Sequence, residues 1–251
     1  DSFRGAPAQD KVATLVNAAR AQDAAASNKW VELVAIGARD EDVRVRQAAI
    51  NSVAARFGSV RFRPSQEVLA RRDRDRVHEP VLRRIAEEGL SDPDENVRRD
   101  SIVALGQLDV GSGRDINDID LSERTARLIT LMYDQETSGA VQAEIVKSLA
   151  LIRKPVPGER ELYVKALTST IPDVLQFAAV GAAKVREVSV VARIAELLEH
   201  GERAVRMSAA TSLLRFGSDS SGFGPQVRAA LAAETDPAIK RTLEQLLGTI
   251  Q

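Results

Sequence analysis

The sequence contains no cysteine and only two histidines, which excludes several kinds of site at the outset. Disulfide bonds, thiol nucleophiles and thiolate metal ligands all require cysteine, and a zinc site rich in histidine needs more imidazoles than His78 and His200 supply. The two histidines are also too far apart in the sequence to suggest a Ser-His-Asp arrangement, and no glycine-rich phosphate-binding motif of the usual kinds occurs. We therefore expect no catalytic site, no cofactor and no bound metal.

Long hydrophobic runs and aromatic residues are scarce as well. No stretch of about 18 apolar residues occurs, so the sequence predicts no membrane-spanning helix and shows no secretory leader. The chain begins at Asp1 rather than at Met, which fits a removed leader or a trimmed sequence, so no compartment is assigned. Aromatics make up only 4% of the residues, so the core has to be built from Ala, Val, Leu and Ile, which suits closely packed helices.

Charge of both signs is abundant and unevenly distributed. The 35 basic and 36 acidic residues give a net charge of -1, which excludes a globally basic nucleic-acid binder but leaves a local basic patch open. Residues 56–84 contain nine arginines against four acids, whereas residues 86–145 contain fourteen acids against five arginines. In a repeat protein, this segregation predicts neighbouring positive and negative surface regions.

A repeated segment accounts for most of the chain. Residues 40–54 (DEDVRVRQAAINSVA) align with residues 92–106 (DPDENVRRDSIVALG) around an apolar anchor residue that recurs six times, with a mean spacing of about 39 residues. The apolar residues four, five and eight positions after each anchor share its face of a helix. The six anchors are Val45, Val97, Val141, Val174, Val205 and Ile239.

A second helical run precedes each anchor segment, so each unit is predicted to be a helix pair. Asn28 is expected to cap the first of these runs, and Pro80 and Pro225 suit the first turns of two others. One further helix, residues 10–20, is expected to cap the N-terminal end of the stack. The six preceding runs cover residues 29–37, 79–90, 122–133, 160–168, 187–199 and 225–234.

In four units an acid lies three residues before the anchor and a base lies one residue after it. The favoured interpretation is local: the acid caps the helix start, and the two side chains form an i,i+4 pair. The alternative is a ladder that links successive units. The four pairs are Asp42 with Arg46, Asp94 with Arg98, Glu202 with Arg206, and Asp236 with Lys240. Units three and four lack the pair, with Ser138 and Gln142 in one and Ile171 and Leu175 in the other.

The D-x-x-V-R start and the apolar spacing that follows it resemble HEAT repeats, particularly the bacterial HEAT-like type also found in phycobilisome lyases. The resemblance covers roughly residues 28–250, and the acid and base positions resemble the ladder between HEAT units. It implies an all-α fold, a right-handed α-α superhelix (HEAT-like solenoid) of about six helix pairs with an N-terminal capping helix. The predicted domains are a tail with the capping helix (1–27) and the solenoid (28–251), with insertions at about 57–77 and 109–121. The first insertion is predicted to be a long loop.

The same resemblance implies that the second helix of each pair lines a concave face, where the exposed side chains are polar and mixed. We predict a non-enzymatic scaffold that docks another protein along this face, with the basic insertion as an auxiliary contact. The predicted partner-binding residues are Gln47, Asn51, Arg99, Lys147 and Arg241 on the second helices and Arg61, Arg63, Arg71, Arg72, Arg74 and Arg76 in the insertion.

Three alternatives remain open at this point. Residues 71–76 could be a solvated segment whose charges compensate one another. The chain could also bind nucleic acid through the arginine-rich insertion, or it could be a subunit similar to the bilin lyases, in which HEAT pairs hold a chromophore.

Overall fold

The computed structural model describes residues 2–20, 23–58, 66–109, 123–152 and 155–250, and all the regular structure in these ranges is helical. The helices form two compact units, residues 1–125 and residues 126–251, which are described separately. Among the described residues, no helix is both long enough and apolar enough to cross a membrane.

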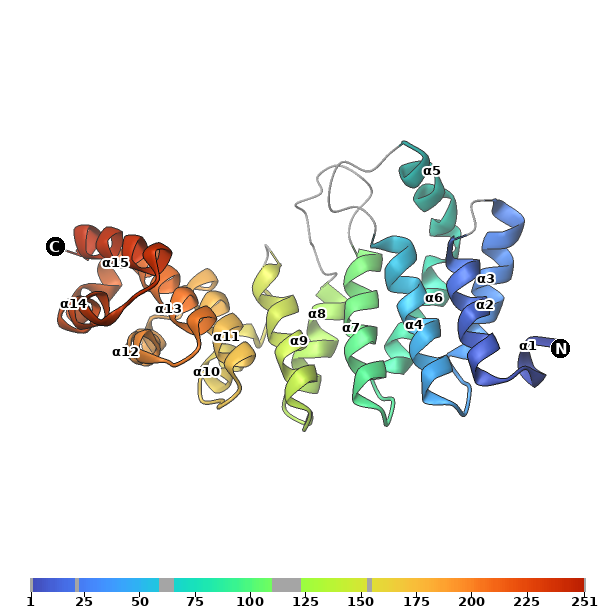
Figure 1. The fold of residues 1–251 in the computed structure, drawn as a ribbon, viewed down its shortest axis with the longest axis horizontal. Coiled ribbons are helices and arrows are strands. Elements are labelled where there is room, and N and C mark those ends of the chain that lie inside the picture. Colours follow the sequence, from blue (N-terminus) through green and yellow to red (C-terminus); the bar gives the residue numbers. More distant parts are fainter. Residues whose placement is uncertain (1, 21–22, 59–65, 110–122, 153–154, 251) are drawn as a thin grey trace. The chain divides into compact units, whose positions relative to one another are not determined.

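The first unit is a two-layered stack of helices (Figure 1). Helices α2, α4 and α7 pack side by side in one layer, and α3 and α6 form the other layer. Helix α8 (Glu123–Tyr133) crosses the boundary to the second unit. The elements of the first unit are α1 (Ser2–Gly5), α2 (Ala8–Arg20), α3 (Ala24–Gly37), α4 (Val43–Phe57), α5 (Gln66–Asp75), the 3-10 helix η1 (Arg76–His78), α6 (Glu79–Gly89) and α7 (Glu95–Asp109).

The second unit repeats this arrangement. Helices α9, α11, α13 and α15 pack in sequence in one layer, while α10, α12 and α14 pack against them. The described helices therefore follow the predicted order of six pairs, and the fold is an all-α solenoid. The elements are α9 (Gly139–Leu151), α10 (Glu159–Ala166), α11 (Pro172–Lys184), η2 (Val188–Val190), α12 (Val191–Glu196), η3 (Leu197–Glu199), α13 (Arg203–Phe216), η4 (Gly217–Phe223), α14 (Gly224–Ala233) and α15 (Pro237–Ile250).

The predicted anchors occupy the core, since all six are buried. Small side chains let the helices approach closely: Gly181 of α11 lies against the ring of Tyr163, in space that a Cβ atom would fill. Trp30, the one tryptophan, is fully buried in the first unit and its indole N–H donates to the Ser52 hydroxyl at 3.1 Å. The core thus combines aliphatic and small residues with a few aromatics, as the composition predicted.

Two predictions about local structure are wrong. Helix α3 begins at Ala24, where Asp23 accepts the backbone N–H of Ala26 at 2.8 Å, so Asn28 lies inside the helix rather than at its cap. The first insertion is not a loop throughout, because residues 66–78 form α5 and η1. Arg71 and Asp75, four residues apart and so on the same face of α5, are both buried. Residues 59–65 of this insertion, and residues 110–122 of the acidic one, lie outside the described residues.

A recurring turn joins the two helices of every unit. The residue five positions before the anchor accepts, through its side chain, the backbone N–H of the residue two positions later, which closes a compact turn. The six acceptors are Asp40, Asp92, Glu136, Ser169, His200 and Glu234.

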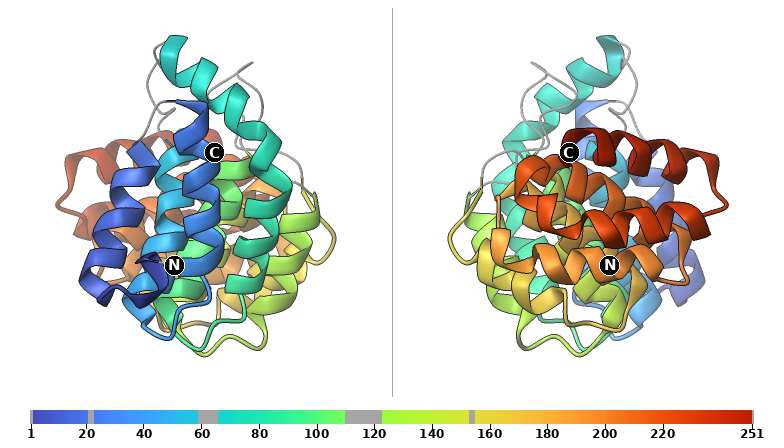
Figure 2. Two further views of the ribbon diagram at one scale, coloured as in Figure 1. Left: turned by 90° about the vertical axis from the view of Figure 1, so that its right-hand side faces the viewer. Right: turned by 90° about the vertical axis from the view of Figure 1, so that its left-hand side faces the viewer.

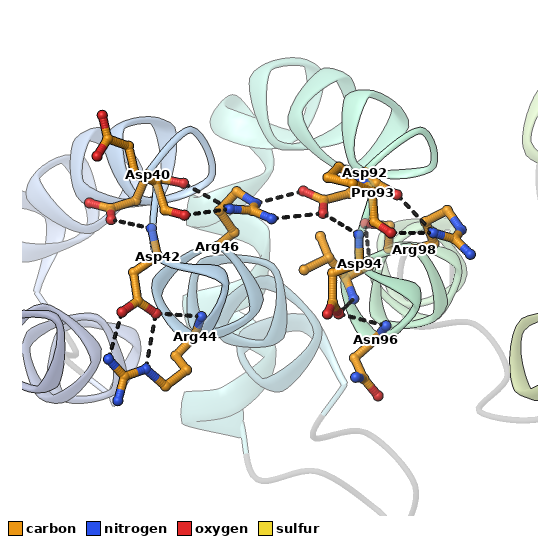
Figure 3. A network of polar contacts seen from close by, with 12 residues as sticks. Asp40, Asp42, Arg44, Arg46, Asp92, Pro93, Asp94, Asn96 and Arg98 are labelled. Atoms are coloured by element: carbon orange, nitrogen blue, oxygen red, sulfur yellow. Dashed lines mark hydrogen bonds and ion pairs between the residues drawn. The ribbon is translucent and has the colours of Figure 1, made fainter. Parts of the chain in front are cut away.

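The base after the anchor links one such turn to the next, as the ladder interpretation proposed (Figure 3). The Arg46 guanidinium contacts the Asp92 carboxylate at 2.7 and 3.0 Å while donating to the carbonyl oxygens of Asp40 and Glu41 in its own turn. Asp42 caps α4 as predicted, but its side chain pairs with Arg44 at 2.6 Å instead of with Arg46. The favoured i,i+4 pairing is therefore wrong here, because Arg46 gains a half-buried carboxylate and two carbonyl acceptors in the ladder.

The second unit contains a matching contact. The Arg206 guanidinium contacts the Glu234 carboxylate at 2.8 and 3.2 Å and donates to the carbonyl oxygens of His200 and Gly201. Asp236 caps α15 and pairs with Arg203 at 2.6 Å. The partner in these two ladder contacts is thus the acid five positions before the next anchor. The acid three positions before the anchor caps the helix at Asp42 and Asp236, but the predicted cap is wrong at Glu202, whose side chain makes no capping hydrogen bond at the start of α13.

The ladder makes a prediction for the pH dependence of stability. The Arg206 guanidinium and the backbone N–H groups of Asp236 and Thr235 lower the pKa of Glu234 from 4.5 to about 2. Because the pKa is lower in the folded chain, the contribution of Glu234 to stability is complete above about pH 4.5 and is lost as the pH falls towards 2. We expect Glu234→Gln to be less stable than the wild type at neutral pH, with a difference that shrinks between these limits.

Urea denaturation of both proteins from neutral pH to about pH 3 measures this difference. Glu244→Gln, a change at an exposed residue of the same helix α15, is the matched control and should leave the curve unchanged. A difference between wild type and Glu234→Gln that stays constant with pH would contradict the assignment.

Candidate functional site

A groove of about 900 Å³ runs along the face where α2 and α4 pack together in the first unit. Its lining residues recur at the three- and four-residue spacing of a single helix face, so each helix presents one continuous stripe. Helix α2 contributes Gln9, Val12, Val16, Ala19 and Arg20. Helix α4 contributes Arg44, Gln47, Ala48, Asn51, Ser52 and Ala55, and Arg71 of α5 completes the lining.

The lining combines an apolar stripe with polar and basic side chains. Val16 is 40% exposed although it is a large apolar residue, and the small side chains of Ala48 and Ala55 leave the space above α4 open. Three arginines line the groove, but none of its described lining residues is acidic. The surface therefore suits a ligand that has apolar side chains and negative charge.

A buried polar network fixes one end of this groove. The Arg56 guanidinium donates to Asp75 at 2.7 Å and to the last carbonyl groups of α2, those of Ala18 and Ala19, at 3.3 and 3.1 Å. The Ser27 hydroxyl donates to the other Asp75 oxygen at 2.7 Å, and Arg56 lies 4.7 Å from the centre of the Trp30 ring. This network ties α5, which extends beyond the ends of α2 and α4 (Figure 2), to three helices of the first unit.

Arg71 lies next to this network and is only 9% exposed. Its Nη2 donates to the Arg56 carbonyl oxygen at 3.4 Å, while its Nε has no hydrogen-bond partner among the described residues. Burial, and then the positive charge of Arg56, lowers the pKa of Arg71. Both oxygens of Asp75 already accept from Arg56 and Ser27, so this carboxylate is occupied, and the second guanidinium group nearby, that of Arg71, forms no ion pair with it.

Three of the predicted partner-binding residues come together in the groove: Gln47 and Asn51 on α4, and Arg71 on α5. The Gln47 amide also donates to Asp100 of α7 at 2.8 Å, and Arg99 contacts the same carboxylate at 3.1 Å, outside the groove lining. Lys147 on α9, 3.1 Å from Glu144, and the exposed Arg241 on α15 belong to the second unit.

The remaining arginines of the basic insertion are dispersed. Arg74 is exposed on α5, and Arg76 lies in η1, 3.5 Å from Asp73. Arg72 belongs to α5, but its side chain is not among those described, and Arg61 and Arg63 lie outside the described residues. The interpretation of residues 71–76 as a solvated segment whose charges compensate one another is therefore wrong for Arg71 and Asp75, which are both buried.

The two histidines lie in short segments that connect longer helices. His200 acts in the recurring turn, where its Nδ1 accepts the backbone N–H of Glu202 at 3.0 Å. His78 is the last residue of η1. Within the described ranges, no group of three or more histidines and acids is placed to hold a metal ion.

Comparison with known proteins shows the fold. No protein-family model and no curated protein matches the sequence. Among solved structures, a HEAT-like repeat protein of the archaeon Thermococcus onnurineus is 12% identical and superposes with a TM-score of 0.62 over 99% of this chain and 94% of that one. Computationally designed armadillo repeat proteins for modular peptide recognition give 12% identity and a TM-score of 0.59 over 88% of this chain and 100% of that one.

The phycocyanin lyase complex of CpcE and CpcF from a Nostoc species is also similar, at 16% identity and a TM-score of 0.51 over 88% of this chain and 76% of that one. At these identities the likeness concerns the fold alone. The chain therefore has the all-α solenoid fold of HEAT-like and armadillo repeat proteins, as the sequence pattern predicted.

Proposed function

We propose that the chain is a non-enzymatic protein-binding scaffold that docks a partner on the face lined by the second helices of its units. The observation that carries the proposal is the groove between α2 and α4, because it leaves apolar side chains such as Val16 open beside polar ones. Exposed apolar area flanked by polar residues is typical of surfaces that associate with other proteins.

Two further observations support this function. Gln47 and Asn51, which the resemblance to HEAT repeats places on the binding face, line the groove. The designed armadillo proteins of the same fold were made for modular peptide recognition, which shows that a solenoid of this kind can present such a surface.

The test is affinity purification of the tagged chain from its native extract, with nuclease treatment and washes at low and high salt. We expect a partner protein to remain bound to the wild type in stoichiometric amount through every treatment. The same partner should be lost with Val16→Glu, which places a charge on the groove floor. Val164→Glu is the matched control, since Val164 lies on α10 and is exposed to the same 40%.

Different outcomes would contradict the proposal. Recovery of nucleic acid alone, or of proteins that are lost on nuclease treatment, would favour the nucleic-acid alternative, because phosphate contacts weaken as salt rises. A partner retained equally by Val16→Glu would show that binding does not use the groove.

A further inference from the structure

We infer that the groove between α2 and α4 binds an acidic peptide segment of the partner, in an extended conformation, with one carboxylate reaching Arg71. The inference rests on the proposed function and names the chemistry of the segment that is bound. It follows from the charge of the groove, from the burial of Arg71, and from the small apolar side chains along the floor.

The charge of the groove favours an acidic ligand. The groove is lined by Arg20, Arg44 and Arg71 and, among its described lining residues, by no acid. Arg44 pairs with Asp42, but its side chain is 69% exposed and a surface ion pair of this kind contributes little to stability. A ligand with carboxylates would therefore complement this surface, whereas a basic segment would be repelled.

The position of Arg71 favours a carboxylate at the α5 end of the groove. Its guanidinium is buried at the α5 end of the groove, its Nε lacks a partner among the described residues, and the nearby Asp75 carboxylate is held by Arg56 and Ser27. A buried donor without an acceptor costs free energy that an incoming acceptor would recover. A carboxylate at this point would satisfy the Nε and balance the second guanidinium.

The length of the groove sets the spacing of the acids. Arg44 lies in the first turn of α4, and Ala55, in the last turn, lies at the end near Arg71. Eleven residues of helix span about 16 Å, which an extended peptide covers in about five residues. The preferred segment thus has two acids about five positions apart, with apolar residues between them that rest on Val16 and Ala48.

The same lining disfavours a single-stranded nucleic acid, the other polyanion that arginines attract. Such strands are held by aromatic side chains that stack on the bases, and none of the described residues that line the groove is aromatic.

The experiment is fluorescence anisotropy with the full chain and a labelled peptide, Glu-Ala-Leu-Ala-Leu-Glu. Peptides with Gln or with Lys in place of both Glu residues, and a ten-nucleotide thymidine strand, are the comparison probes. We expect the acidic peptide to bind at least tenfold more tightly than the Gln peptide, and the Lys peptide and the thymidine strand to bind no better than the Gln peptide.

Two pairs of variants locate the site. Arg71→Gln is expected to weaken binding of the acidic peptide at least tenfold, whereas Arg74→Gln, on the same helix but exposed outside the groove, leaves it unchanged. Because Arg71 is buried, circular dichroism must show that its variant is folded. Asn51→Asp is a second test of the site, since it adds a negative charge at an exposed groove position and is expected to weaken binding of the acidic peptide. Asn17→Asp on α2, outside the groove lining, is its control.

Equal binding of the acidic and Gln peptides, tighter binding of the thymidine strand, or full binding by Asn51→Asp would overturn the inference. The proposed function would survive these results if the captured protein were still lost with Val16→Glu and retained with both Arg71→Gln and Asn51→Asp. Loss of the captured protein with Asn51→Asp and not with Asn17→Asp would support both the proposed scaffold function and the binding of an acidic segment in the groove.

Discussion

Glu159→Ala is expected to lower the free energy of unfolding by about 3–5 kcal/mol, the typical cost of removing one partner from a buried ion pair. Glu159 is completely buried in the second unit. It accepts the Tyr163 hydroxyl at 2.5 Å and the backbone N–H of Val156 at 2.9 Å, and it forms an ion pair with Lys184. Without it, the Lys184 ammonium would retain the Leu149 carbonyl oxygen at 2.7 Å but no carboxylate among the described residues.

In the native fold, burial already disfavours the charged form of Lys184. Burial lowers its pKa, and the contact with Glu159 is the interaction that opposes this shift. Removal of Glu159 therefore leaves a costly buried charge or forces the lysine to lose its proton. Chemical denaturation measures the effect, and Glu161→Ala, at an exposed residue of the same helix α10, should change stability by no more than about 0.5 kcal/mol. Equal losses in the two variants would show that the buried triad of Glu159, Tyr163 and Lys184 is not stabilising.

Asp75→Ala should produce a loss of similar size, about 3–5 kcal/mol, in the first unit. The Asp75 carboxylate is 1% exposed and accepts from Arg56 at 2.7 Å and from Ser27 at 2.7 Å. Its removal leaves the buried Arg56 guanidinium without its carboxylate, next to the positive charge of Arg71. The same change cuts the contact that ties α5 to α3 and α4, so we expect faster amide hydrogen exchange throughout α5.

Urea denaturation followed by hydrogen exchange checks both parts of this expectation. Asp73→Ala is the matched control, because Asp73 is on the same helix and its side chain is 71% exposed. If Asp75→Ala unfolded at the wild-type urea concentration, or if α5 kept its protection, the network would not be what holds α5 in place.

The repeat was predictable from the sequence because one apolar residue in each unit must be buried in the same way. The anchors from Val45 to Ile239 are all buried, and in four of the six units an acid and a base flank the anchor at the same positions. Helix starts were less predictable, since Asp23 and Asn28 are both suitable capping residues, and the structure places the cap at Asp23, with Ser27 buried in the first turn of the helix.

The candidate site was predicted only in part. Gln47 and Asn51 followed from the resemblance to HEAT repeats, but five of the twelve described residues that line the groove come from α2, which was expected only to cap the stack. The network of Arg56 and Asp75 was missed because charged residues are usually exposed, so an arginine-rich segment suggests a solvated loop. One signal was available: Arg71 and Asp75 are spaced four apart, so on a helix they would face the same side.

The partner of each ladder arginine was missed for a related reason. A sequence shows the acid four residues before Arg46, but it does not show that the turn of the following unit brings Asp92 closer. The six-fold recurrence of a polar residue five positions before the anchor was the available signal, since Asp40, Asp92, Glu136 and Glu234 are all acidic.

The ladder gives the solenoid a direction. Arg46 and Arg206 each complete their own turn through backbone carbonyls and also reach forward to the acid of the following unit, whereas the acids reach only their own turn and the preceding arginine. Shortening the chain from its two ends is therefore not equivalent. Removal of residues 224–250 would leave the Arg206 guanidinium, whose side chain is only 20% exposed, without its carboxylate partner. An acid that lost the preceding arginine would still accept the backbone N–H that closes its own turn. Units of this kind are best added or exchanged together with the turn that follows them.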